Sequence, residues 1–139
     1  MFCEGIVPLV RYSEEALIRY LVAKIDPFSH KSWVMVYAHS GTANSSALTD
    51  LMKEWFRAAQ LKYERTLVNL YVLHPTWAFR AMYSSYFSYF LWDTLYNNTE
   101  YFETIQELKK HVGNPNLPLV PIIQQYEAER ESSLLGGLF

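Results

Sequence analysis

Two apolar runs of the chain end at side chains that could act in nucleophilic chemistry. Residues 33–39 end at His39, which is followed by Ser40 and Gly41, and residues 66–73 are followed by His74. The carboxyl ends of parallel strands are where active sites gather in α/β proteins. A serine hydrolase of that architecture would show a G-x-S-x-G turn, which this sequence lacks. We therefore expect no enzyme, and a hydrolase using His74 or His39 is the weakest of three hypotheses.

The His74-Pro75 step has a simpler structural explanation. Proline disfavours helical geometry in the residue before it and suits the first turn of a helix. We expect Pro75 to hold His74 extended and to begin the next helix, so that the pair forms a structural hinge. The imidazole would then hydrogen-bond to a neighbouring loop, with no nucleophile beside it.

Metal and cofactor sites are not indicated. His30, His39, His74 and His111 are scattered, and none shares a helix face with another. The single cysteine, Cys3, excludes an internal disulfide and offers no zinc cluster. The phosphate-binding loops G-x-x-x-x-G-K-[ST] and G-x-G-x-x-G are also absent. The sequence predicts neither a metal nor a cofactor.

The helix expected after Pro75 carries a stripe of large side chains. At 100° per residue the stripe contains Phe79, Tyr83, Tyr86 and Phe90, flanked by Met82, Phe87 and Tyr89. The opposite face is small and contains Ala81, Ser84, Ser85 and Ser88. We expect the small face to approach the rest of the domain, which leaves the rings to a core, a groove or a partner. Buried tyrosine hydroxyls need hydrogen-bond partners, which suits an amphiphilic ligand, and an ordinary aromatic core is the alternative.

Hydrophobic periodicity predicts the elements that position these residues. Helices are expected over residues 13–25, 47–63, 75–92, 106–112 and 122–133, and strands over residues 33–39, 66–73 and within 97–105. Residues 33–39 are typical of a central strand buried on both faces. Strands that alternate with helices predict an α/β class, with a mixed, mainly parallel sheet and flanking helices. We expect one domain over residues 1–139, with its core at about 13–128 and a flexible tail at 129–139.

Composition excludes several classes of protein. A chain of 139 residues with net charge −2 has one domain's worth of apolar residues and no basic footprint for nucleic acid. Its N-terminus has no signal-peptide pattern, and its most hydrophobic stretch, residues 77–92, is too short to span a bilayer. We expect a soluble cytoplasmic protein, with peripheral attachment to membranes left open.

Several consecutive stretches resemble one family. "WVMVYAHSG" is followed by a helix that runs into "LVNLYVLHPTW", then by the aromatic helix, a short strand and "IQELKKHV". This order resembles the CRAL-TRIO family of lipid-binding domains. It is most similar to the divergent BCH-type branch, found in small Rho GTPase-activating proteins and in relatives fused to macro domains. The resemblance extends over residues 16–127 and is most specific at residues 67–76.

The resemblance implies a non-enzymatic, CRAL-TRIO-like domain with a pocket beneath the aromatic helix. Relatives hold a phospholipid or another small lipophile there, or serve as scaffolds for Rho-type GTPases and for self-association. Arg80 is the expected contact to a headgroup or partner, because the branch often carries Lys or Arg at this position. The expected lining consists of Val34, Val36, Phe79, Met82, Tyr83, Tyr86, Phe87 and Phe90.

Two hypotheses for function follow from this resemblance. The first is lipid binding or lipid transfer, with transient contact to a membrane surface. The second is an interaction scaffold that binds a small Rho-type GTPase or forms a homodimer.

Overall fold

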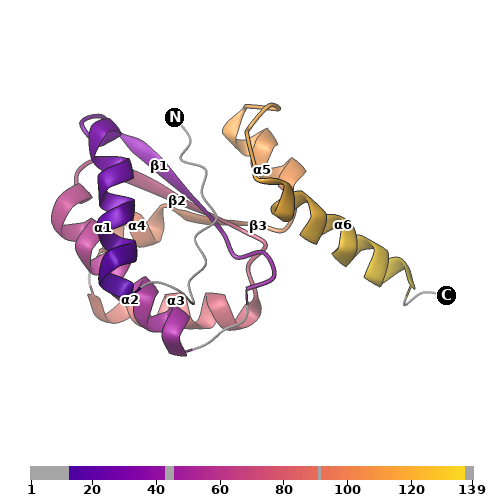
Figure 1. The fold of residues 1–139 in the computed structure, drawn as a ribbon, viewed down its shortest axis with the longest axis horizontal. Coiled ribbons are helices and arrows are strands. Elements are labelled where there is room, and N and C mark those ends of the chain that lie inside the picture. The colour runs from indigo at the N-terminus through magenta and orange to yellow at the C-terminus, as the bar shows by residue number, and fades with distance from the viewer. Residues whose placement is uncertain (1–12, 43–45, 91, 137–139) are drawn as a thin grey trace.

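A sheet of three parallel strands organises the chain. The computed structural model describes residues 13–42, 46–90 and 92–136. Within these residues, β1 (Trp33–Ala38) pairs with β2 (Leu67–Leu73), and β2 pairs with β3 (Thr99–Phe102), in both cases in parallel (Figure 1). Helices occupy the connections between the strands, so the expected α/β class with a mainly parallel sheet and flanking helices is confirmed, and both strand pairings among the described residues are parallel.

The central strand of the sheet is β2. In the part of the chain that the structure describes, β1 lies at the edge, and its Val34 is 41% exposed. The expectation that residues 33–39 form the central strand is therefore wrong for the described sheet. In β2, by contrast, Leu70, Val72 and Leu73 are fully buried, because neighbouring strands and helices cover both of its faces.

Helices lie on both sides of the sheet. They are α1 (Glu14–Ile25), the 3₁₀ turn η2 (Asp26–Phe28), α2 (Ser46–Tyr63), α3 (Trp77–Phe90), α4 (Asp93–Asn97), α5 (Ile105–Val112) and α6 (Pro121–Gly136). Figure 1 shows α1 to α4 on one side of the strands and α5 on the other, with α6 extending away from the sheet.

Side-chain caps mark the starts of several helices. The hydroxyl of Ser13 accepts a hydrogen bond from the backbone N–H of Ala16, as expected for the first helix, and Thr104 caps α5 in the same way. Thr76 accepts from the backbone N–H of Phe79, so α3 begins at Trp77. The expectation that Pro75 lies inside the helix is wrong, because Thr76 takes the capping role.

Alternation along the strands divides the core into two clusters. On the face covered by α1 to α4, the buried residues include Trp55, Leu70, Phe79, Tyr83 and Leu95. On the other face, Leu73, Phe102, Ile105, Leu108 and Leu117 pack together. We call these the first and the second cluster. Successive strand residues point to opposite faces, so along β1 each cluster takes alternate residues.

Two elements differ from the expected boundaries. The single turn α4 was not expected, because five residues are too few to show a helical period. Helix α6 continues past residue 133 to Gly136, so part of the segment expected to be a tail is helical.

Candidate functional site

The aromatic stripe of α3 faces the sheet. Phe79, Tyr83 and Tyr86 are buried in the first cluster, and Met82 is partly buried against it. Ala81, Ser84 and Ser85 are exposed. The expected orientation of the helix is therefore reversed: its large face approaches the domain, and its small face is turned outward.

Protein groups satisfy the hydroxyls of this stripe. The Tyr83 hydroxyl lies 2.7 Å from Oγ1 of Thr99, and the Tyr86 hydroxyl donates to the backbone oxygen of Lys53 at 3.2 Å. The Tyr83 ring stacks on Phe79 and meets Phe56 edge-on. Burial raises the pKa of Tyr83 above its usual range, so its phenol stays protonated. These contacts describe an aromatic core, with the helix held closed against the sheet.

The structure does not bring the whole expected lining together. Val36 packs against the second cluster, on the face of the sheet opposite to α3. Val34 has the same parity along β1 and is 41% exposed. One pocket beneath α3 cannot include both valines and the α3 rings, because alternate residues of a strand point to opposite faces. The side chains of Phe87 and Phe90 lie outside the described residues.

Arg80 projects from the exposed face of α3. Its guanidinium donates to Oε1 of Glu103 at 2.8 Å and lies 4.5 Å from the ring centroid of Tyr101. Arg130 of α6 approaches the other oxygen of the same carboxylate, at 4.0 Å. The cation expected to contact a headgroup is thus half-exposed and stacked on an aromatic ring, with one acidic neighbour.

Two indole N–H groups in the first cluster have no acceptor in the part of the chain that the structure describes. Trp55 belongs to α2 and Trp92 precedes α4, and each side chain is only 3% exposed. A buried donor without an acceptor costs about 1–3 kcal/mol, so native proteins rarely leave one unpaired. Sequence patterns identify such tryptophans as core residues and give no sign of the missing acceptor.

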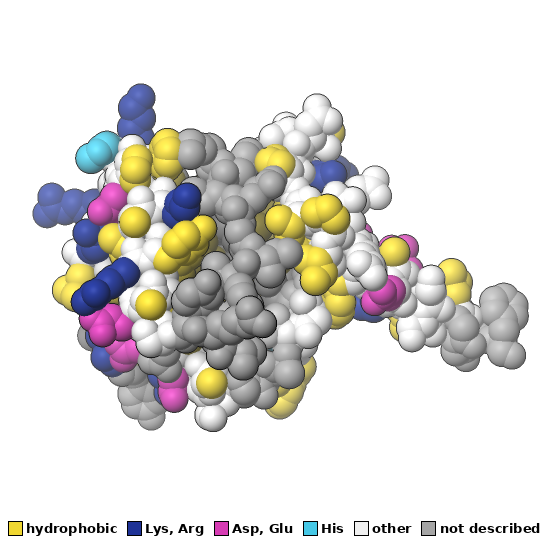
Figure 2. Space-filling model, in the orientation of Figure 1, with side chains coloured by type: hydrophobic (Ala, Val, Ile, Leu, Met, Phe, Trp, Pro, Cys, Tyr) yellow, Lys and Arg dark blue, Asp and Glu magenta, His cyan; other side chains and the backbone are white. Residues whose placement is uncertain are grey.

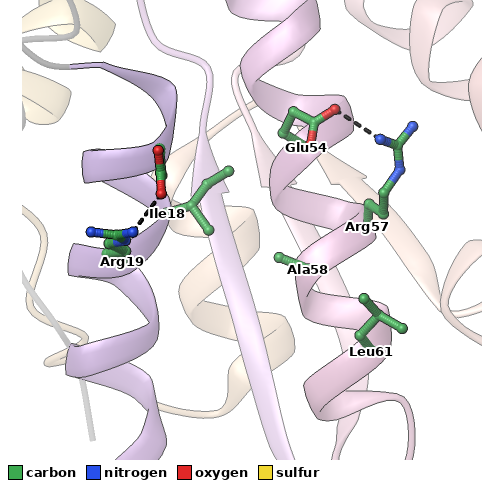
Figure 3. Close-up of a pocket in the computed structure, with 7 residues that line it drawn as sticks. Ile18, Arg19, Glu54, Arg57, Ala58 and Leu61 are labelled. Atoms are coloured by element: carbon green, nitrogen blue, oxygen red, sulfur yellow. Dashed lines mark hydrogen bonds and ion pairs between the residues drawn. The ribbon is translucent and has the colours of Figure 1, made fainter.

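A groove separates α1 from α2. Its volume is about 380 Å³, and it is lined by Glu15, Ile18, Arg19, Glu54, Arg57, Ala58 and Leu61. Figure 3 shows Ile18 across from Ala58 and Leu61, with the ion pair of Glu54 and Arg57 beside them. Leu61 is 84% exposed. The groove is therefore an open apolar strip bordered by charges of both signs.

The face seen in Figure 2 separates most charged side chains from a hydrophobic group. Figure 2 shows cationic and anionic side chains gathered over α1, and hydrophobic side chains near the first turns of α6. Ile122, in the first turn of α6, is among the exposed large apolar residues.

His74 lies at the centre of a buried polar group. Its Nδ1 is 2.6 Å from Oγ of Ser40, and its Nε2 is 3.1 Å from Oε1 of Glu127 on α6. The same carboxylate oxygen accepts the backbone N–H of Ile105 at 2.8 Å. The expectation that the imidazole binds a neighbouring loop is confirmed, whereas the expectation that no nucleophile lies beside it is wrong.

The backbone of His74 is not extended. Its φ is +53°, in the left-handed region that residues with a side chain seldom occupy. The expectation that Pro75 holds His74 extended is therefore wrong. Its backbone N–H donates to the oxygen of Phe102, which ties this strained residue to the end of β3. The sequence did not predict the positive φ, because a proline predicts an extended conformation for the residue before it.

The residues that the structure describes contain no group of three potential metal ligands. Nor is any helix in those ranges long and apolar enough to cross a bilayer. Cys3 lies outside the described residues.

Comparison with known proteins identifies a family and several relatives. The model of the divergent CRAL/TRIO domain matches residues 1–129. Rho GTPase-activating protein 68F of Drosophila melanogaster is 26% identical over 106 residues, which cover 76% of this chain and 22% of that protein. Ganglioside-induced differentiation-associated protein 2 is 25% identical over 124 residues in Mus musculus, covering 88% of this chain and 24% of that protein. The same protein in Danio rerio is 27% identical over 128 residues, which cover 91% of this chain and 25% of that protein.

These relatives are longer than the region they share. The chain spans about a quarter of the length of the curated relatives it matches. No solved structure matches the chain.

Proposed function

Because the chain belongs to the divergent CRAL/TRIO domain family, we propose that it binds a phospholipid or another small lipophile in the first cluster, beside α3. The observation that carries this proposal is the pair of buried indole N–H groups of Trp55 and Trp92, which lack acceptors among the described residues. Ester carbonyl or phosphate oxygens of a lipid would supply them.

The apolar part of such a ligand would lie against α3. Met82 and Tyr86 of α3 belong to the same cluster as the two tryptophans. Transfer of an acyl chain from water to an apolar site yields about 0.8 kcal/mol per CH₂, so even a short buried segment would hold the ligand. The predicted contacts of Phe87 and Phe90 remain part of this proposal, whereas Val34 and Val36 do not.

Entry of the ligand requires α3 to move. The helix is fastened by the Tyr83–Thr99 and Tyr86–Lys53 hydrogen bonds, and by the Arg80–Glu103 ion pair near its start. Movement of α3 also exposes the buried rings of Phe79, Tyr83 and Tyr86, and the apolar interior of a membrane would receive these rings and allow exchange. The proposal includes this encounter at the cytoplasmic surface of a membrane.

Native mass spectrometry of protein purified without detergent tests the proposal. We expect a bound lipid, and we expect Trp55→Phe and Trp92→Phe each to reduce its occupancy several-fold, because phenylalanine keeps the ring and removes the N–H donor. Trp77→Phe is the matched control, since Trp77 is 83% exposed. Absence of any co-purified or exchangeable lipid contradicts the proposal. Full lipid occupancy in both variants, together with an increased free energy of unfolding, would also contradict it. That result would mean that the two indole N–H groups are unsatisfied donors with no role in lipid binding.

A second candidate function is an interaction scaffold that binds a small Rho-type GTPase or a second copy of the chain. The groove between α1 and α2 favours it, because an apolar strip with ionic borders resembles the core and rim of a protein interface. The name of the Drosophila relative also connects this family with Rho GTPases.

Capture experiments with nucleotide-loaded GTPases and light scattering test this second function. Leu61→Asp should abolish binding or self-association, whereas Leu134→Asp, at an exposed position of α6, should not. A monomer that captures no GTPase in either nucleotide state rules the scaffold out.

A further inference from the structure

Ser40, His74 and Glu127 form a hydrogen-bonded chain with the composition of a hydrolytic triad. Ser40 follows β1, His74 follows β2 and Glu127 lies on α6, so three separate segments converge. We propose that Ser40 is an activated nucleophile that accepts the acyl group of small carboxylic esters, with His74 as general base and Glu127 as the group that orients it. This activity goes beyond the proposed binding function and does not depend on it.

The hydrogen bonds select one tautomer of His74. A carboxylate accepts hydrogen bonds only, so Nε2 carries the proton and donates to Glu127. The lone pair of Nδ1 is then directed at the Ser40 hydroxyl, 2.6 Å away. In the Ser-His-Asp triad the serine bonds Nε2 instead, so the two ring nitrogens exchange roles here. Either imidazole nitrogen can accept a proton, so the exchange preserves the chemistry.

The carboxylate is held in place independently of the histidine. Oε1 of Glu127 accepts the backbone N–H of Ile105 at the start of α5, at 2.8 Å. Its side chain is 16% exposed and that of His74 is fully buried. An oriented and desolvated acid beside an imidazole favours the protonated imidazolium that forms during nucleophilic attack.

The backbone around the serine is constrained as well. His74 has a φ of +53°, which is strained for a residue with a side chain, whereas Gly41, next to Ser40, adopts its φ of +67° without strain. Strained backbone persists where surrounding contacts enforce it, and such residues cluster at functional sites. The ring of Tyr126 lies 3.3 Å from the place of a Cβ on Gly41. The Tyr126 ring therefore lies close to the backbone next to the half-buried Ser40, which is why we specify a small acyl group.

The reaction proceeds in two balanced steps. Oγ of Ser40 adds to the carbonyl carbon of the ester while its proton moves to Nδ1 of His74. The bond from that carbon to the alcohol oxygen breaks, and Nδ1 returns the proton to the departing alcohol. Water then adds to the acyl-serine with the same proton transfers, which releases the carboxylic acid and restores the hydroxyl.

Labelling with a small alkyl fluorophosphonate tests the nucleophile directly. We expect one adduct per chain, mapped to Ser40 by peptide mass spectrometry, and no adduct in Ser40→Ala. Ser32→Ala, which removes an exposed serine outside this group, should label as the wild type does. Glu127→Gln should slow labelling by about tenfold or more, because loss of the orienting carboxylate weakens the base.

Three outcomes overturn the proposal. The first is a folded wild-type protein that is not labelled at Ser40. The second is a labelling rate that is unchanged when the wild type is unfolded in urea. The third is a folded Glu127→Gln variant that reacts as fast as the wild type, with folding checked by circular dichroism. Should that variant fail to fold, the comparison of native with unfolded wild type decides alone.

Discussion

The phenolic oxygen of Tyr63 lies 2.6 Å from Oδ1 of Asp26, so the end of α2 is joined to the turn that follows α1. The hydrogen bond from Tyr63 is the main cause that lowers the pKa of Asp26 below its ordinary 3.8, with Lys62 acting in the same direction. Burial, reinforced by Asp26, raises the pKa of Tyr63 above its usual range. The tyrosine therefore remains the donor and the carboxylate the acceptor at any pH near neutrality.

This pair predicts a specific acid dependence of stability. The pKa of Asp26 is lower in the folded state than its ordinary value of 3.8. Its contribution to the free energy of unfolding is therefore complete above pH 3.8 and is lost as the pH falls through the lower pKa of the folded state. Asp26→Asn should flatten this part of the acid dependence of the free energy of unfolding. Urea unfolding from about pH 2.5 to about pH 6 measures it. Tyr63→Phe should reproduce most of the effect, and an unchanged dependence in Asp26→Asn contradicts the prediction.

Helix α4 should contribute substantially to stability through one side chain. Leu95 is fully buried in the first cluster, whereas Leu61 is 84% exposed on α2. Leu95→Ala should lower the free energy of unfolding by about 2–5 kcal/mol, because it leaves a cavity under β2. Leu61→Ala is the matched control and should change it by less than about 0.5 kcal/mol. Similar effects from both substitutions in chemical denaturation would show that α4 is not packed as described.

The fold could largely be predicted from the sequence, and its departures have local causes. The caps of α1 and α5 and the apolar runs of β1 and β2 are local signals, and the structure confirms them. The position of β1 at the edge of the described sheet is not a local property, since an edge strand and a central strand can have the same composition. α4 was missed because it is a single turn, whose only buried residue is Leu95.

Two glycines with positive φ should respond differently to a methyl group. Gly113→Ala has open space around the new Cβ and should cost only the left-handed backbone, about 1–2 kcal/mol. Gly41→Ala should cost more, because its Cβ would lie 3.3 Å from the Tyr126 ring. The difference in stability between Gly41→Ala and Gly113→Ala, measured by thermal denaturation, gives the cost of the contact with Tyr126. In a Tyr126→Ala background the excess should disappear, and an excess that persists would exclude the ring as its cause.

The candidate sites were harder to predict than the fold. Helical periodicity correctly placed Phe79, Tyr83 and Tyr86 on one face of α3, but it could not say that the face meets the sheet. Ser40, His74 and Glu127 are far apart in sequence, and the 3.1 Å contact of His74 with Glu127 depends on how α6 is placed relative to the end of β2. Unpaired donors such as those of Trp55 and Trp92 are a property of packing, which no sequence spacing encodes.

The exposed ion pair between Arg80 and Glu103 allows a role of Arg80 in binding to be distinguished from a role in stability. Arg80 and Glu103 are both about half-exposed, so water weakens their attraction, and Arg80→Gln should change the free energy of unfolding by less than about 1 kcal/mol. A contact of Arg80 with a headgroup, which the family resemblance predicts, should make the same substitution weaken binding to vesicles containing anionic phospholipid several-fold.

Arg57→Gln provides the comparison for Arg80→Gln. Arg57 is also exposed and paired, with Glu54 at 2.9 Å, but it lies on α2 at the groove. It should have a similarly small effect on stability and should leave vesicle binding unchanged. Vesicle sedimentation measures both variants under the same salt conditions, because screening affects each cation alike. Equal losses of vesicle binding in the two variants would mean that binding depends only on the net charge of the protein, and Arg80 would then have no specific role.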